Sequence, residues 1–296
     1  MERLITKAVG AYLNSLAVLA PRKAGEQGVK IFCHPIRPSM KAHHKLFLES
    51  SEKFDITLED VRLQAYRWGN GPRKVLFLHG WQSHSFRWKK YIESLSKDEF
   101  TVYAFDAPGH GFSDGSFLSV PFYSEAIRQF IIRIGAIDTV ISHSMGGFAI
   151  VYALYKTPLL PVNRLVLMAS PGEASDFIQV YRERLNLTDR TINHTLNHFE
   201  ILFGQPVEYF SVPKFAASLM KPGIIIHDQK DDEAPYEYAR QINSAWKHSH
   251  LITTNGLGHN LKSQDVMKTV LEFVNGNAGT EFSSDQYKLI QERLQD

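Results

Sequence analysis

Apolar residues recur along the chain in two patterns, one typical of buried strands and one typical of helices. Short, nearly continuous apolar runs predict strands at 74–80, 100–105, 137–144, 164–170, 223–228 and 250–256. Between them, apolar residues spaced about 3.6 positions apart predict helices at 124–135, 145–156, 236–246 and 265–274. Strands that alternate with helices in this way predict an α/β fold, with a mostly parallel central sheet and helices on both faces.

The remaining segments do not follow this alternation and divide the chain into regions. Residues 54–68 indicate two short strands that form a hairpin. Residues 172–221 show helical patterns without a clear strand, which predicts a helical lid inserted into a core of residues 51–171 and 222–276. Residues 1–50 predict an N-terminal helical extension packed on the core, and residues 277–296 predict a C-terminal helix.

The composition fits a globular protein with a sizeable core. Hydrophobic residues make up 44% of the 296 residues, and the net charge of +2 provides no global field for nucleic acid. The one cysteine, Cys33, can form no internal disulfide and no cysteine-based metal cluster, and it suits the cytoplasm. The chain contains no run of 18 apolar residues, so we expect no integral membrane span.

The N-terminal region carries a local excess of positive charge. Its first 45 residues contain eight lysines and arginines against Glu2 and Glu26. The first 21 residues have a basic start and an apolar stretch, but Asn14 and Ser15 interrupt it, and Pro21 follows the only small-residue cleavage site. We therefore expect an amphipathic helix rather than an export signal, and the basic charge leaves a peripheral membrane contact open.

The stretch VISHSMGGFAI at 140–150 places a serine where a predicted strand meets a predicted helix with almost no loop. Ser144 then lies on a sharp turn, so its neighbours Ser142, Gly146 and Gly147 must be small. The following helix directs its N-terminus toward the serine, which favours negative charge there. A nucleophilic serine needs such a turn, together with donors for the developing oxyanion and a nearby base.

The segment S-H-S-M-G-G resembles the nucleophile elbow, G-x-S-x-G, of the α/β-hydrolase superfamily, with Ser142 in place of the first glycine. VLFLHGW at 75–81 is similar to the superfamily's strand and oxyanion loop, and DAPGHGFSDG at 106–115 looks like its D-x-x-G-x-G-x-S loop. The resemblance implies the α/β-hydrolase fold. It also implies that the backbone N–H groups of Trp81 and Met145 form the oxyanion hole.

The same resemblance implies the acid and the base of a catalytic triad, in the order serine, acid, histidine. The segment GIIIHDQKDDEAP aligns with the acid-bearing segment of the superfamily and puts Asp231 at the acid position, with Asp232 and Asp228 as alternatives. The segment GLGHN follows one helix and one strand later and supplies His259 as the base. The base would take the serine proton and return it to the leaving group, while the acid would orient the imidazole.

Other histidines carry weaker signals. We expect His143, next to the serine, to pack in the wall of the site, and His79 to hydrogen-bond the oxyanion loop rather than react. His194 and His198 have i,i+4 spacing, but no third ligand lies at a suitable spacing. We therefore expect no metal and no other cofactor.

Together these patterns predict a carboxylesterase-like serine hydrolase (EC 3.1 class) that cleaves a small or medium carboxylic ester or thioester through an acyl-enzyme on Ser144. The partner would be a small-molecule acyl substrate, and the protein would be a cytoplasmic monomer or homodimer that binds no nucleic acid. Three alternatives stay open: a non-catalytic ligand-binding member of the superfamily, a membrane-associated lipase or acyltransferase, and a C–C bond hydrolase.

Overall fold

The computed structural model describes residues 2–276 and 284–294, which form two compact units. The smaller unit contains the chain up to His34 together with Glu173–Ser211. The larger unit contains Pro35–Gly172 and the chain from Val212 onward.

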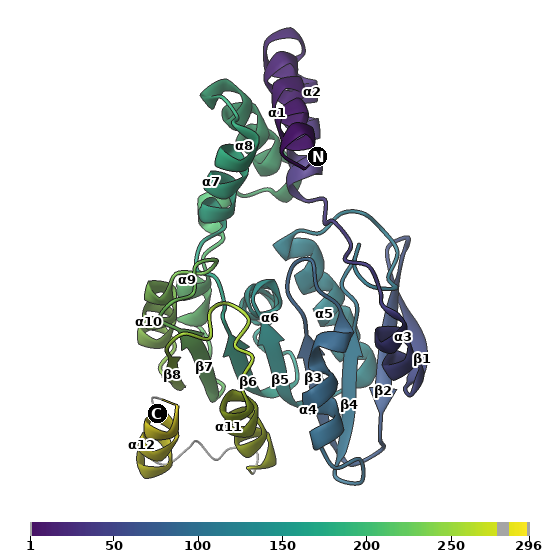
Figure 1. Cartoon of the computed structure of the whole chain (residues 1–296), viewed down its shortest axis with the longest axis vertical. Coiled ribbons are helices and arrows are strands. Elements are labelled where there is room, and N and C mark those ends of the chain that lie inside the picture. The colour runs from purple at the N-terminus through teal and green to yellow at the C-terminus, as the bar shows by residue number, and fades with distance from the viewer. Residues whose placement is uncertain (1, 277–283, 295–296) are drawn as a thin grey trace. The chain divides into compact units, whose positions relative to one another are not determined.

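The larger unit is built on an eight-stranded sheet whose strands follow the order β1-β2-β4-β3-β5-β6-β7-β8 (Figure 1). The first pairings, β1 with β2 and β2 with β4, are antiparallel, and all pairings from β4 to β8 are parallel. This is the predicted α/β-hydrolase architecture. The strands are β1 Glu52–Leu58, β2 Val61–Trp68, β3 Arg73–Leu78, β4 Phe100–Phe105, β5 Ile137–His143, β6 Val162–Met168, β7 Gly223–Asp228 and β8 Ser249–Thr254.

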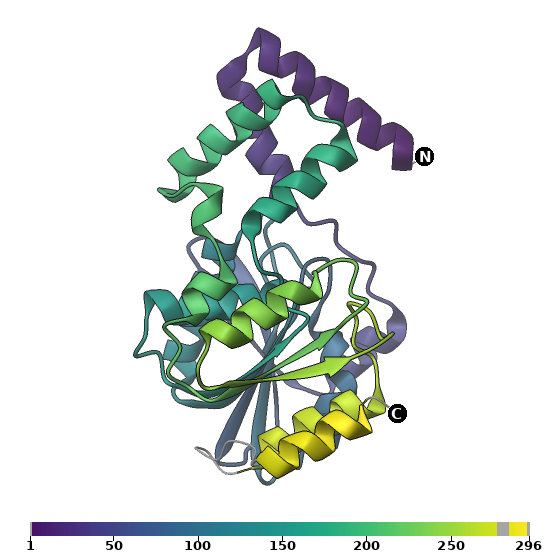
Figure 2. The same ribbon diagram turned by 90° about the vertical axis from the view of Figure 1, so that its left-hand side faces the viewer.

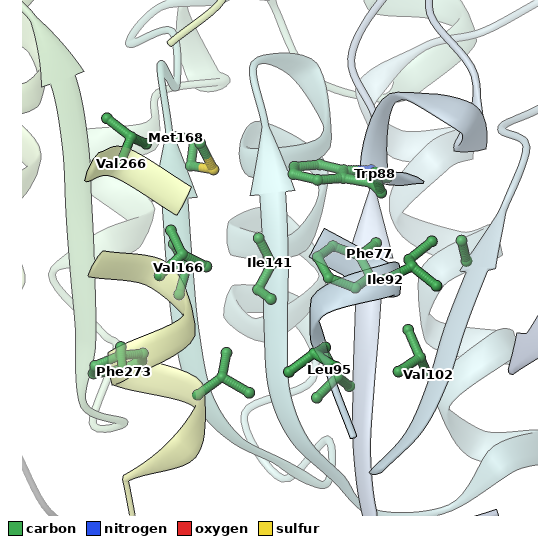
Figure 3. Packing of buried hydrophobic residues seen from close by; sticks show 14 of the residues in the cluster. Phe77, Trp88, Ile92, Leu95, Val102, Ile141, Val166, Met168, Val266 and Phe273 are labelled. Atoms are coloured by element: carbon green, nitrogen blue, oxygen red, sulfur yellow. The ribbon is translucent and has the colours of Figure 1, made fainter. Parts of the chain in front are cut away.

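Helices cover both faces of the sheet, which explains why its central strands are apolar without alternation. Figure 1 shows α4 and α11 in front of the sheet and α5 and α6 behind it. On the front face, Phe77, Ile141 and Val166 of neighbouring strands pack with Val266 of α11 in one buried cluster (Figure 3). The helices of this unit are α3 Ala42–Glu49, η1 Ser85–Trp88, α4 Lys89–Ser94, α5 Val120–Ile134, α6 Met145–Lys156, α9 Val212–Ala216, α10 Tyr236–Ala245, α11 Gln264–Asn275 and α12 Ser284–Arg293.

The exposed edge of the sheet at β8 is closed by a side chain of α12. Gln291 accepts a hydrogen bond from the N–H of Thr253 at 3.0 Å and donates one to the carbonyl of the same residue at 2.9 Å. Its amide therefore takes the place of one residue of a further strand. The predicted C-terminal helix at 277–296 corresponds to α12, while residues 277–283 and 295–296 of that prediction lie outside the described residues.

The smaller unit consists of α1 Glu2–Leu19, α2 Pro21–Phe32, α7 Ala174–Leu185, α8 Asp189–Phe203 and the short η2 Val207–Tyr209 (Figure 2). Pro21 begins α2, because the first position of a helix needs no N–H donor. Asn14 of α1 ties the unit together, since its amide donates to the carbonyl of Asn186 and accepts from the N–H of Thr188.

The bounds of these units differ from the predicted regions. The predicted extension at 1–50 is divided at His34, because residues 42–49 form α3 within the larger unit. The predicted insertion at 172–221 is shorter in the structure, because α9 also belongs to the larger unit. Within the smaller unit, the N-terminal helices and the inserted helices pair through long-range contacts, such as the bonds of Asn14, that no local pattern shows. The role of the inserted helices as a lid stays a prediction.

Candidate active site

Ser144 lies between β5, which ends at His143, and α6, which begins at Met145. Its φ angle of 52° is in the left-handed region, where a residue with a Cβ atom is strained. Its N–H donates to the carbonyl of Met168 at the end of β6, at 2.9 Å. The serine is therefore held in a sharp turn at the carboxyl edge of the sheet, where ligands of open α/β sheets bind.

Close packing around this turn accounts for the glycines in the motif. A Cβ atom on Gly146 would lie 2.7 Å from the carbonyl oxygen of Leu78 and 2.8 Å from that of His79. A Cβ atom on Gly80 would lie 2.9 Å from the Cβ of Ser144, so the loop after β3 passes directly beside the serine. Only residues without a side chain allow these backbones to approach so closely.

Two backbone N–H groups on either side of the serine have no hydrogen-bond acceptor among the described residues. One belongs to Met145, which as the first residue of α6 has no intrahelical acceptor. The other belongs to Trp81, which follows Gly80 in the loop after β3. The N-terminus of α6 adds a positive potential at this point. The predicted oxyanion donors are thus unpaired and lie on the two segments that meet at the serine.

Asp231 follows β7 and His259 follows β8, and their side chains are in contact. Nδ1–H of His259 donates to Oδ2 of Asp231 at 2.9 Å, and the N–H groups of Glu233 and Ala234 donate to Oδ1 at 2.9 and 2.8 Å. Burial would raise the pKa of this carboxyl group, but hydrogen bonds from His227, His259 and the Ala234 N–H outweigh that effect and lower the pKa. The carboxylate is therefore ionised, and Nε2 of His259 makes no hydrogen bond within the described part of the chain.

The two alternative acids have other environments. Asp228 accepts hydrogen bonds from backbone N–H groups and a hydroxyl of residues 254–257, so it fixes the loop that leads to His259. Asp232 is exposed. Within the described part of the chain, Asp231 is the acid among these three that contacts the imidazole.

Ser144 and His259 are not hydrogen-bonded to each other, and the serine hydroxyl has no hydrogen-bond partner among the described residues. The backbone around the imidazole is held by two other side chains. Nε2–H of His143 donates to the carbonyl of His259 at 2.8 Å, and Arg87 donates to the carbonyl of Asn260 at 2.8 Å. Bonds between nucleophile and base are often long in a free enzyme and shorten when substrate binds.

His143 and Arg87 have roles that the sequence analysis did not identify. His143 was expected only to pack in the wall of the site, and Arg87 was not considered. Their partners lie 116 and 173 positions away along the chain, so no local pattern could have revealed them. Burial, together with the charge of Arg87, keeps the pKa of His143 well below its usual value, which makes this imidazole a neutral hydrogen-bond donor.

The loop after β3 is fixed by buried polar residues. Nδ1–H of His79 donates to the carbonyl of Gly80 at 2.8 Å, and its Nε2 accepts from the N–H of Ala107 at 2.9 Å. Burial lowers the pKa of His79 to about 3, so the ring is neutral and fully engaged, as expected for a structural role. The buried carboxylate of Asp106 accepts from the N–H and the hydroxyl of Ser85 and connects the same loop to β4.

A cavity of about 580 Å³ lies beside the loop that carries His259 and is lined in part by Trp88, Met168 and Asn260. Ser144 and His259 are not among the residues that line it, although Met168, whose carbonyl accepts the Ser144 N–H, is. Among the described residues, no group of three His, Cys, Asp or Glu side chains could hold a metal ion. None of the described helices is both long and apolar enough to cross a bilayer.

Comparison with known proteins agrees with this architecture. The sequence pattern of the alpha/beta hydrolase family matches residues 75–217, which include the loop after β3 and the serine turn. With the sheet order and the strand–serine–helix junction, this match identifies the chain as a member of the α/β-hydrolase superfamily.

The similar proteins include esterases and lipases. A pimeloyl-[acyl-carrier protein] methyl ester esterase of Nitrosomonas europaea is 38% identical over 103 residues, which is 34% of this chain and only 38% of that protein. A monoacylglycerol lipase of Mycolicibacterium smegmatis is 26% identical over 69% of this chain and 87% of that protein. The crystal structure of a bacterial membrane phospholipase A superposes with a TM-score of 0.59 at 14% identity, over 94% of this chain and 100% of that one. The esterase and the lipase support a hydrolase that acts on esters, whereas the structural superposition shows the fold alone.

Proposed function

We propose that this chain is a serine hydrolase that cleaves a small or medium carboxylic ester or thioester through an acyl-enzyme on Ser144. The observation that carries the proposal is the 2.9 Å hydrogen bond between Asp231 and His259 on loops after adjacent strands, at the sheet edge that also bears the strained Ser144 turn. Asp231 and His259 are 28 positions apart in the sequence, so no local pattern explains their contact.

The first step would be the attack of the Ser144 oxygen on the acyl carbon of the substrate. Nε2 of His259 takes the hydroxyl proton as the new C–O bond forms, and the ionised Asp231 stabilises the imidazolium. The imidazole then gives this proton to the leaving alcohol or thiol as the acyl–leaving-group bond breaks. Water activated by the same imidazole hydrolyses the acyl-enzyme and restores the serine.

The N–H groups of Trp81 and Met145 would stabilise the tetrahedral oxyanion in both half-reactions. They need no reorganisation, because the Gly80 and Gly146 contacts fix the backbone on both sides of the serine. In known enzymes the loss of one such donor costs about 3 kcal/mol of transition-state stabilisation.

Two features support acyl transfer over the alternatives within the superfamily. The names of the relatives include a methyl ester esterase and a monoacylglycerol lipase, both of which act on carboxylic esters. The second feature is the contact of the buried Asp231 carboxylate with the His259 imidazole, which a serine hydrolase uses to orient its base and which a ligand-binding site without turnover does not require. A C–C bond hydrolase would use the same residues, so only a substrate panel separates it.

Covalent labelling with a fluorophosphonate tests the proposal. We expect one adduct, mapped to Ser144 by peptide mass spectrometry, and loss of both labelling and p-nitrophenyl acetate hydrolysis in Ser144→Ala. Ser142→Ala, two residues away, serves as the matched control and should label normally. Folded protein that takes up no label at Ser144, or Ser144→Ala with unchanged turnover, would refute the proposal. A panel of acyl chain lengths then defines the substrate class.

A further inference from the structure

The outward face of α1 is predominantly apolar. Five large apolar residues of this helix are each more than half exposed, namely Leu4, Ile5, Tyr12, Val18 and Leu19. At 100° per residue they fall on one side of the helix, and the exposed positions between them are occupied by Ala8, Ala11 and Ser15. An apolar stripe of this kind on a folded protein marks a contact with something other than water.

Packing on the opposite side of α1 fixes the direction in which this stripe points. Leu13 and Ala17 are buried, and Gly10 approaches α7 so closely that a Cβ atom would lie 1.8 Å from the carbonyl oxygen of Leu185. The Asn14 amide accepts the hydroxyl of Thr191 at 2.7 Å in addition to its bonds with the turn between α7 and α8. The helix therefore cannot turn its apolar residues inward.

Basic residues border the stripe. Lys7 is the one charged residue among the described side chains of α1, and it is exposed. Arg22 and Lys23 follow in the first turn of α2, and both are exposed. The acids near them are paired with arginines, Glu26 with Arg22 at 3.1 Å and Asp189, next to the turn bound by Asn14, with Arg182 at 2.6 Å. An apolar helix face with a basic border and an interfacial tyrosine has the composition that binds to anionic bilayer surfaces.

The size of the stripe argues against a second copy of the chain as the occupant. A helix of 18 residues is about 27 Å long and about 10 Å wide, so its face offers about 270 Å². A specific protein–protein interface needs about 800 Å² on each partner. A parallel symmetric dimer through this face would also bring the Lys7 charges of two copies together.

We infer that α1 docks this protein on the surface of a membrane that contains anionic phospholipids, with Leu4, Ile5, Tyr12, Val18 and Leu19 in the boundary between headgroups and acyl chains. The inference goes beyond the proposed function, because docking requires no chemistry at Ser144.

Co-sedimentation with lipid vesicles tests the inference on the full chain. The background is Ser144→Ala, so that lipid hydrolysis cannot change the vesicles and a failure of docking stays distinct from a failure of the proposed chemistry. We expect binding to vesicles of phosphatidylcholine with phosphatidylglycerol that is at least tenfold stronger than binding to phosphatidylcholine alone. The double substitution Leu4→Ser and Leu19→Ser should weaken binding at least tenfold, because it removes two of the inserted side chains.

A matched double substitution separates docking from a general change in surface polarity. Ile132→Ser and Leu159→Ser replace two other exposed apolar residues, on α5 and in the loop after α6, and should leave binding unchanged. Circular dichroism verifies that all variants are folded. The inference is overturned if the chain does not bind anionic vesicles or if both double variants bind equally. It is also overturned if sedimentation velocity shows a dimer that the Leu4→Ser and Leu19→Ser substitutions dissociate.

Discussion

Asp231→Asn separates the orienting role of the carboxylate from its role in folding. Oδ1 of Asp231 accepts the N–H groups of Glu233 and Ala234, while Oδ2 faces Nδ1–H of His259 at 2.9 Å and Nε2 of His227 at 3.3 Å. An asparagine that keeps its oxygen on the two backbone donors must direct its NH₂ group toward the two imidazoles. The reverse orientation would set NH₂ against two backbone N–H groups.

The geometry determines the orientation of the asparagine amide and therefore the tautomer of His259. Each donor left without an acceptor costs about 1–3 kcal/mol, so the orientation that keeps both backbone bonds is favoured. The NH₂ group then meets Nδ1 of His259, which must lose its proton, and the imidazole changes to the tautomer that carries the proton on Nε2. That tautomer cannot accept the serine proton. The expected loss in kcat is about 10⁴-fold, equivalent to about 5.5 kcal/mol.

Steady-state hydrolysis of p-nitrophenyl acetate gives kcat for the wild type and the variant, and nitrogen NMR of the His259 ring reports its tautomer. Asp232→Asn is the control, since this neighbour is exposed and should change kcat less than about twofold. A variant Asp231→Asn that is folded and keeps more than a tenth of the wild-type kcat would refute this assignment of roles. So would an Asp232→Asn variant with an equally large loss.

Three further predictions concern stability. Gly146→Ala puts a Cβ atom 2.7 Å from a carbonyl oxygen at the end of β3 and should lower Tm by several degrees in calorimetry, whereas Gly147→Ala, whose nearest contact is 3.1 Å from a hydroxyl, should lower it less. Arg164→Met removes the buried partner of Asp138 and should cost about 3 kcal/mol in urea unfolding. The lowered pKa of Asp231 stabilises the fold above pH of about 4, so the Tm advantage of the wild type over Asp231→Asn should shrink as pH falls below that value.

Each of these expectations has an outcome that contradicts it. Equal Tm values for the two glycine variants would mean that the backbone at the end of β3 moves to accommodate the Cβ atom added by Gly146→Ala at no cost in stability. An Arg164→Met variant as stable as the wild type would mean that Asp138 is neutralised by Arg73, which lies 3.2 Å away. A Tm difference that grows in acid would mean that the carboxylate is protonated more easily in the folded protein than in the unfolded chain.

The sheet and the serine turn were predictable because their causes are local. A strand buried on both faces carries an unbroken apolar run, so its sequence shows it, as with VLFL at 75–78 of β3 and III at 224–226 of β7. The turn at Ser144 requires small neighbours for steric reasons, and the Gly146 contacts give those reasons as distances. The pairing of Asp231 with His259 followed only from the resemblance, because Asp228 and Asp232 carry the same chemistry in the same loop.

Other features were not predictable from local patterns. The helices α3 and α4 have 8 and 6 residues, too short to show a helical period. Asn14 reads in sequence as an interruption of an apolar helix, yet in the structure it accepts the N–H of Thr188 at the start of α8. The structural role of a polar residue inside an apolar pattern can be recognised only when its hydrogen-bond partner is known. For Asn14 that partner, Thr188, lies 174 positions away.

The serine turn and the loop that carries His259 are connected through His143, the residue that directly precedes Ser144. His143 is the last residue of β5, so its backbone continues directly into Ser144, while its ring donates to the carbonyl of His259 at 2.8 Å and lies 4.9 Å from the His259 ring. The next backbone N–H is bound to Met168 of β6. One strand end therefore fixes Ser144, the proposed nucleophile, on one side and the loop of His259, the proposed base, on the other, so a reorganisation that separates the two must first break a buried hydrogen bond. Such fixed positions are what electrostatic stabilisation of a transition state requires, since dipoles already in place need not reorient as the charge develops.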